Sequence, residues 1–163
     1  MRNIHIAVTS GSVAVVALIL AAPLLAADGH PLVSLVFYRT FAPLCHQLPE
    51  RSFSLSGFPL AVCARCLGLY GGFAAGMLVL IASSQTTASA NTLLKVLAAS
   101  WLPLMVDGFG GWFGLFENTP FTRFITGSIA GAGVAYFVAA VIAQSAGYNK
   151  PDHRKRTLED HPL

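Results

Sequence analysis

The sequence predicts an all-α integral membrane protein with four transmembrane helices and a short interfacial helix in the first outer segment. Three observations lead to this fold class. Hydrophobic residues make up 55% of the 163-residue chain and charged residues only 10%, whereas ordinary globular domains carry roughly 25% charged residues. Four apolar runs are each long enough to cross the hydrocarbon layer, which takes about 20 helical residues. These runs lack the alternating pattern of a membrane β-strand.

The four apolar runs cover residues 4–27, 60–82, 92–115 and 122–146. Because lipid offers the backbone no hydrogen-bond partners, each run is expected to be a helix. Pro120 stands just before the fourth run, where a helix accepts proline without losing a hydrogen bond.

The first run also resembles a secretory signal peptide, since Arg2 precedes it and Ala26-Ala27 ends it. The run is longer than the usual apolar segment of such a peptide. Cleavage after Ala26 would also put Leu24 where a small residue is preferred. We therefore expect this helix to be retained.

The segment between the first two spans, residues 28–59, contains an apolar stretch over 31–44 that is too short to cross a membrane. We expect this stretch to lie at the interface. Residues 1–147 are taken as one transmembrane domain, and residues 148–163 as a basic polar tail that is expected to be disordered.

Lysine and arginine counts predict the orientation, because these residues concentrate on the cytoplasmic side. Four spans put both termini on one side, with six basic residues against four on the other. We expect a cell inner or plasma membrane protein with cytoplasmic termini. The six are Arg2, Lys95, Lys150, Arg154, Lys155 and Arg156, and the four are Arg39, Arg51, Arg65 and Arg123.

The thiol residues gather near the start of the second span. Cys45 and His46 lie in the outer segment, and Cys63 and Cys66 form a Cys-x-x-Cys motif. Three thiolates and an imidazole make a tetrahedral zinc set, with copper or iron as alternatives. Because adjacent Cys and His ligands are less usual, the alternative is that one of these two does not bind the metal and that Asp107 is the fourth ligand.

Two other interpretations of the thiols remain open. Cys63 and Cys66 could be a redox pair whose thiol pKa is lowered by the helix start and by Arg65. Alternatively, a disulfide could staple the outer loop in an extracytoplasmic compartment.

Asp107 and Arg123 are charged residues within predicted spans, where such residues pair with each other or serve a pathway. The simplest role is an ion pair of Asp107 with Arg65 or Arg123. The alternative is a polar pocket, formed with Asn118, in which arginines face a phosphate or carboxylate group. Taken singly, Arg39 and Arg51 are expected to be ordinary interfacial charges, although Arg51 could join such a pocket.

Small residues recur every fourth position on the second and fourth spans. This spacing makes a flat strip that lets two helix backbones approach closely. The packing strips are Gly68, Gly72 and Gly76 on the second span and Gly127 and Gly131 on the fourth.

The run Cys45-His46-Gln47, Arg51-Ser52, Gly57 and Cys63-Ala64-Arg65-Cys66 resembles the prokaryotic membrane proteins grouped as "domain of unknown function 2085". Asp107-Gly108 and the Asn118, Arg123 and Thr126-Gly127 run fit the same pattern. Leu67 and Gly110-Gly111 depart from it, because Thr and Gln are usual there. The resemblance implies a multi-helix membrane protein and brings no known reaction.

The leading hypothesis from the sequence is a metal site formed by Cys45, His46, Cys63 and Cys66 beside a pocket of Arg65, Asp107, Asn118 and Arg123. The alternatives are a membrane thiol–disulfide oxidoreductase, and a small transporter or accessory subunit without catalysis. The expected partners are the lipid bilayer, an anionic small molecule or lipid head group, and a second copy of the chain. The net charge of +3 does not indicate nucleic-acid binding, because four of the ten basic residues lie in the last fourteen positions and the rest are scattered.

Overall fold

The computed structural model of the chain describes residues 2–82, 89–115 and 117–148. It contains α1 (Arg2–Ala27), α2 (Pro31–Phe41), α3 (Ala64–Ala82), α4 (Ala90–Trp112) and α5 (Pro120–Tyr148). A 3₁₀ turn, η1 (Pro49–Arg51), and two short strands, β1 (Ser54–Leu55) and β2 (Phe58–Pro59), lie between α2 and α3. The predicted disordered tail falls almost entirely outside the described residues.

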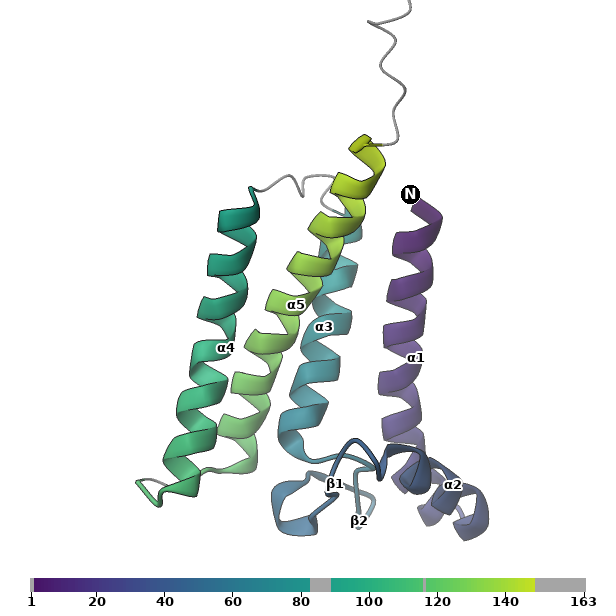
Figure 1. Cartoon of the computed structure of the whole chain (residues 1–163). Coiled ribbons are helices and arrows are strands. Elements are labelled where there is room, and N and C mark those ends of the chain that lie inside the picture. Colours follow the sequence, from purple (N-terminus) through teal and green to yellow (C-terminus); the bar gives the residue numbers. More distant parts are fainter. Residues whose placement is uncertain (1, 83–88, 116, 149–163) are drawn as a thin grey trace, which may run out of the picture.

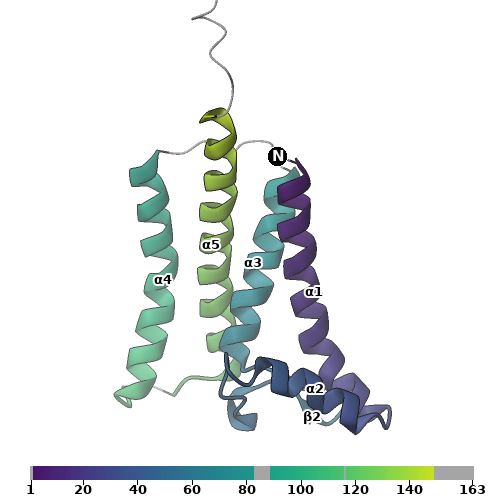
Figure 2. The same ribbon diagram turned by 45° about the vertical axis from the view of Figure 1, so that its right-hand side comes forward.

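Four of these helices, α1, α3, α4 and α5, are long and apolar enough to cross a membrane. This confirms the predicted all-α fold with four spans. Many of their large apolar side chains are exposed, as expected for surfaces that face lipid. The short α2 and the β-hairpin lie together at one end of the helices, opposite the start of α1 and the end of α5 (Figures 1 and 2). We call the end that carries α2 the hairpin end.

The four long helices are arranged in the order α1, α3, α5, α4, and α3 packs most extensively on α5 (Figure 1). Glycines explain this close approach. A Cβ atom on Gly68 or Gly72 would overlap the α5 backbone at Phe124 and Ser128. A Cβ atom on Gly127 or Gly131 would overlap the α3 backbone in return. The two backbones therefore touch directly, as in other small-residue helix pairs.

Local signals set the ends of the helices at the hairpin end. Gly29 has a φ of +80°, and the His30 N–H donates to the Leu25 carbonyl at 2.9 Å, so α1 ends in a left-handed cap. The next helix starts at once, with Pro31 at its first position. Thr119 caps α5, because its Oγ1 accepts from the Thr122 N–H at 3.2 Å.

The third helix of the chain, α3, begins four residues later than the sequence predicts. Residues 60–62 are apolar and buried, as the residues of a packed helix are. Their backbone groups, however, form hydrogen bonds with other segments and not within a helix. The Leu60 N–H donates to the Phe53 carbonyl at 2.8 Å, and the Ala61 carbonyl accepts from Gln47 at 2.7 Å. This run therefore crosses the hairpin end as an irregular segment, and Cys63 directly precedes the first helical residue.

The β-hairpin is a further feature that the sequence prediction did not contain. Ser56 and Gly57 both have a positive φ, 53° and 84° respectively. This combination is the two-residue turn that suits the twist of a hairpin. Leu55 pairs with Phe58 and Ser54 with Pro59.

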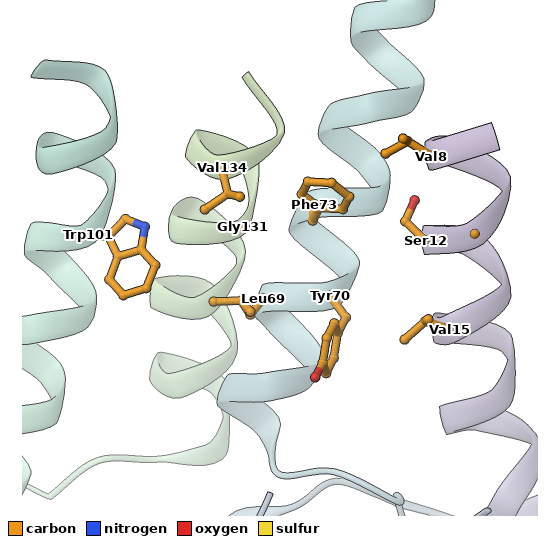
Figure 3. A pocket seen from close by; sticks show the side chains of 10 residues that line it. Val8, Ser12, Val15, Leu69, Tyr70, Phe73, Trp101, Gly131 and Val134 are labelled. Carbon is orange, nitrogen blue, oxygen red and sulfur yellow. The ribbon is translucent and has the colours of Figure 1, made fainter. Parts of the chain in front are cut away.

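The side of α3 that faces α1 is packed less closely. An apolar cavity of about 440 Å³ is lined by residues of α1 such as Val8 and Val15 and by Tyr70 and Phe73 of α3, and it extends to residues of α4 and α5, namely Trp101, Gly131 and Val134. Figure 3 shows the side chains of α1 and α3 directed toward each other across this space. Closer to the hairpin end, Ile19 and Ala22 of α1 are fully buried.

Candidate functional site

Three cysteines come together at the start of α3. Cys45 follows α2, Cys63 immediately precedes α3, and Cys66 lies in its first turn. Their sulfur atoms all lie within 4.8 Å of one another. We call these three residues the thiol cluster. It borders the apolar core of the hairpin end, which includes Phe41 and Val62.

Backbone geometry holds the thiol cluster together. The Cys63 N–H donates to the Cys45 Sγ at 3.1 Å. The Cys63 carbonyl accepts from the Leu67 N–H at 2.9 Å, so Cys63 occupies the N-cap position of α3. At an N-cap, the side chain faces the first free N–H groups of the helix.

This position makes Cys63 acidic. Its pKa falls to about 5, first because the Cys66 thiol donates to its sulfur. The backbone N–H groups of Cys66 and Arg65 and the side chain of Cys45 lower it further, while burial opposes the change. The thiolate is the form that binds metals and attacks disulfides.

Gln47 fixes the loop that carries Cys45. It has a positive φ of 52°, and its Nε2 donates to the Tyr38 and Ala61 carbonyls, each at 2.7 Å. One side chain therefore ties α2 to the segment that leads into α3. The sequence analysis missed this role, although the position of Gln47 directly after Cys45-His46 was a signal.

His46 is not part of the thiol cluster. Its side chain is exposed, and it lines a separate cavity with arginines. The structure thus brings together three of the four metal ligands predicted from the sequence. Asp107, the alternative ligand, is also outside the cluster and pairs with Arg65.

The cavity that His46 lines has a volume of about 570 Å³. Arginines from three elements reach it: Arg51 from η1, Arg65 from α3 and Arg123 from α5. We call it the arginine pocket. Its remaining lining residues are Gly108, Gly111 and Trp112, all in α4.

Asp107 neutralises one of these arginines. Its carboxylate accepts from the Arg65 Nη2, and it is buried while the Arg65 side chain is 29% exposed. The Asn118 Nδ2 donates to the backbone carbonyl of Asp107, which ties the α4–α5 connection to α4. These contacts join the predicted residues Arg65, Asp107 and Asn118 across the hairpin end, and Arg123 lies at the same pocket.

Arg51 and Trp112 also line this site. The sequence analysis allowed Arg51 a place in the pocket as an alternative to an ordinary interfacial charge, and it did not single out Trp112. Arg51 does not share a helix with Arg65 or Arg123, so no periodic spacing in the sequence indicates that it lies near them. Only the turn at η1 brings it to the same cavity. Arg39, the other expected interfacial charge, is exposed on α2.

Comparisons with known proteins agree with this architecture. Residues 45–137 match the family model described as a predicted membrane protein, DUF2085. An uncharacterized protein of Methanocaldococcus jannaschii is 36% identical over 111 residues, which cover 67% of this chain and 70% of that protein. An uncharacterized protein of Methanothermobacter thermautotrophicus is 38% identical over 96 residues, which cover 58% and 84% respectively. No solved structure matches significantly.

The family match starts at Cys45 and extends beyond Gly131, so it includes the thiol cluster, the arginine pocket and the glycine contacts between α3 and α5. More than half of the chain is matched. The chain therefore belongs to the DUF2085 family of membrane proteins.

Proposed function

We propose that this membrane protein binds a soft transition metal ion, zinc in the first instance, through Cys45, Cys63 and Cys66. The observation that carries the proposal is the approach of all three sulfur atoms within 4.8 Å. A tetrahedral zinc with Zn–S bonds of about 2.3 Å holds its sulfurs about 3.8 Å apart. The cluster would therefore close around the ion by shifts of about 1 Å or less.

The donor chemistry fits the ion. Thiolates select zinc and copper(I) over the hard cations that prefer oxygen. The low pKa of Cys63 favours thiolate over thiol at that ligand. A site with three protein ligands leaves a fourth position for water or another ligand, as catalytic zinc sites do.

His46 is the proposed fourth ligand if the site is closed. It follows Cys45 directly in the chain, and its side chain is exposed and free of packing against the core. To reach the ion it would have to rotate away from the arginine pocket. A closed site would be structural, and an open one could polarise a bound ligand.

The test is metal binding by the purified, reduced protein in detergent. Cobalt is the probe, because its sulfur-to-metal charge-transfer bands report thiolate ligation and its visible bands report tetrahedral geometry. We expect one ion per chain and a loss of at least about 100-fold in affinity for Cys45→Ser, Cys63→Ser or Cys66→Ser. This exceeds the 10–100-fold loss that is typical when a residue that only hydrogen-bonds to a metal ligand is changed. Protein that stays free of metal, with three reactive thiols, would refute the proposal.

Two histidine variants separate a closed site from an open one. His46→Ala lowers cobalt affinity and changes its spectrum if His46 is the fourth ligand. His30→Ala is the matched control, because His30 is also exposed at the hairpin end. An unchanged spectrum in His46→Ala would assign the fourth position to an external ligand.

The Cys-x-x-Cys motif supports one other function. Cys63 has the low pKa of an attacking thiol, and Cys66 donates to it. A pair that cycles between dithiol and disulfide in glutathione buffers, without binding metal, would assign a thiol–disulfide oxidoreductase instead.

We also propose that the hairpin end faces outward and that both termini are cytoplasmic. The excess of lysine and arginine on the side of the termini supports this orientation. Glu117→Cys and Ser145→Cys place single labels at the two ends, in a chain whose native cysteines are serines. A membrane-impermeant maleimide should label the first and not the second in intact cells, and the opposite pattern would reverse the orientation.

A further inference from the structure

The arginine pocket carries more positive charge than its carboxylate neutralises. Arg51, Arg65 and Arg123 all line it, and Asp107 pairs with Arg65. Within the described part of the chain, neither Arg51 nor Arg123 forms an ion pair. Like charges gathered beside lipid without partners are costly, so such a cavity favours an anionic occupant.

Arg65, which lines the pocket, also has a side-chain donor without an acceptor. The Arg65 Nε is buried and has no hydrogen-bond partner among the described residues. Asp107 pairs with the same guanidinium through Nη2, the nitrogen that shares an edge of the planar group with Nε. The ion pair therefore fixes the orientation of this planar group, while Arg51 and Arg123 bring further N–H donors to the pocket. Guanidinium groups bind phosphate and carboxylate through such paired N–H donors.

A second cavity continues from the arginine pocket along α4. It has a volume of about 310 Å³ and shares Arg65, Gly108 and Trp112 with the pocket. Its other lining residues, Leu104, Met105 and Phe109, are apolar. We call this second cavity the α4 groove. A charged pocket that shares its wall with an apolar groove suits a molecule with an anionic head and a hydrocarbon chain.

The position of the two cavities matches the level of lipid head groups. Trp112 is 81% exposed at the end of α4, and Phe113 and Phe121 beside it are also exposed. Exposed aromatic side chains at the ends of spanning helices mark the membrane–water interface. The head group of a neighbouring lipid would therefore lie beside the arginines.

We propose that the arginine pocket binds the phosphate of an anionic phospholipid whose acyl chain lies in the α4 groove. Arg51 and Arg123 supply the unpaired charge, and Arg65, held by Asp107, adds a guanidinium group of fixed orientation. Gly108 leaves space for the head group on the α4 side, because a Cβ atom there would meet only the Arg65 Nη1 at 3.9 Å. This site does not require the metal proposed above.

The experiment compares lipid binding by metal-free protein, prepared with a chelator and analysed by native mass spectrometry in detergent. The probes are dioleoyl phosphatidylglycerol and dioleoyl phosphatidylcholine, which differ in head-group charge. We expect the wild-type chain to retain phosphatidylglycerol preferentially. Removing a basic residue near a charged membrane costs about fivefold in affinity. Arg51→Gln/Arg123→Gln should therefore reduce phosphatidylglycerol binding about 25-fold.

Arg39→Gln is the matched control, because it removes an exposed arginine at the same end but outside the pocket. It should change the lipid preference less than about twofold, and circular dichroism should give the same helix content for all variants. Equal retention of the two lipids by the folded wild-type protein would overturn the proposal. An effect of Arg39→Gln as large as that of the double variant would also overturn it, because general surface charge would then explain the preference.

Inorganic phosphate tests whether the anion must be a lipid. Titrated against the bound complex, phosphate should displace phosphatidylglycerol only at a large molar excess, because it cannot occupy the α4 groove. Displacement at equimolar concentration would overturn the lipid assignment and make the pocket a site for soluble phosphate.

Discussion

The two sides of α3 differ in how they meet the rest of the molecule. Toward α5, glycines bring the two backbones into direct contact, and a side chain has no room there. Toward α1, larger side chains meet across an apolar cavity (Figure 3). The first turn of α3 divides in the same way, with Cys66 near the core of α1 and α2, and Arg65 near α4 and α5.

This contrast distinguishes a side of α3 whose packing is rigid from a side that can accommodate changes in side-chain volume. On the α5 side, the backbones are in direct contact at the glycines, so a larger residue cannot fit there without displacing a helix. The α1 side can absorb changes in volume, because its cavity leaves atoms without close neighbours. The residues proposed to bind ligands lie at the hairpin end of both sides, on segments that the fixed pair α3–α5 positions.

The largest expected effect comes from breaking the ion pair on the α5 side. Asp107→Asn leaves the Arg65 charge partly buried without a carboxylate. Breaking a fully buried pair costs about 3–5 kcal/mol, and we expect about 2–3 kcal/mol here, because Arg65 keeps some exposure. Unfolding by added dodecyl sulfate, followed by circular dichroism, measures the free energy.

Glu50→Gln is the control for Asp107→Asn. It removes an exposed carboxylate at the hairpin end and should change the free energy of unfolding by less than about 0.5 kcal/mol. Equal effects of the two changes would mean that the pair does not stabilise the α3–α4 contact.

A methyl group added on the tight side should come next in size. In Gly72→Ala, the new Cβ would overlap the α5 backbone at Ser128, which cannot move without displacing the helix. We expect a loss of about 1–3 kcal/mol, as for other overpacked sites. Gly71→Ala is the matched control, because a Cβ there meets no atom within 4 Å. If Gly71→Ala were as destabilising, helix packing would not be the cause.

The same substitution on the loose side should have the opposite sign. Gly11 lines the cavity between α1 and α3, and a Cβ there meets nothing within 4 Å. Gly11→Ala should stabilise the protein by about 0.5–1 kcal/mol, because alanine loses less conformational freedom in a helix. The dodecyl sulfate titration used for Gly72→Ala measures it. A destabilised Gly11→Ala variant would show that the loose side is closed in solution.

The smallest effect concerns the pH dependence of Cys63. Its lowered pKa of about 5 keeps it a thiolate at neutral pH, so iodoacetamide should alkylate it at nearly constant rate between pH 6.5 and 8.5 in metal-free protein. Cys66→Ala removes the main cause of the lowered pKa and should make the rate rise steeply with pH. Peptide mapping by mass spectrometry follows the reaction. A steep wild-type profile would contradict the hydrogen-bonded thiolate.

The sign of the linked stability change follows from the same pKa. A thiol that is more acidic in the folded protein than in the unfolded chain stabilises the fold fully above the unfolded pKa of about 9. This contribution decreases as the pH falls from about 9 toward 5, because the unfolded chain takes up the proton first.

The sequence was sufficient for the fold because lipid imposes simple rules. Length and apolar composition identified four helices, and the glycine spacing indicated which faces lie close. The predicted start of the second span was wrong because the apolar residues before α3 have a cause other than helix formation. Residues 60–62 are buried in an irregular segment, and burial alone gives them the composition of a helix.

The candidate site was predictable only in part for a related reason. Cys63 and Cys66 are held together by helical spacing, which a sequence reveals. Cys45 and His46 point to different surroundings, because the loop that carries them has no regular period. The positive φ of Gln47 and its two hydrogen bonds fix that loop, and neither follows from a periodic pattern.

The ion pair between Arg65 and Asp107 also bears on how the chain enters a membrane. Each residue alone would cost about 2.5–3.5 kcal/mol at the centre of a helix inserted by the translocation machinery. The two residues lie on α3 and α4, which are consecutive spans, and each comes to rest at the hairpin end. Insertion of both spans as one hairpin would let the charges neutralise each other before either helix is released into lipid. The pair would then make α3 and α4 a single unit of biogenesis.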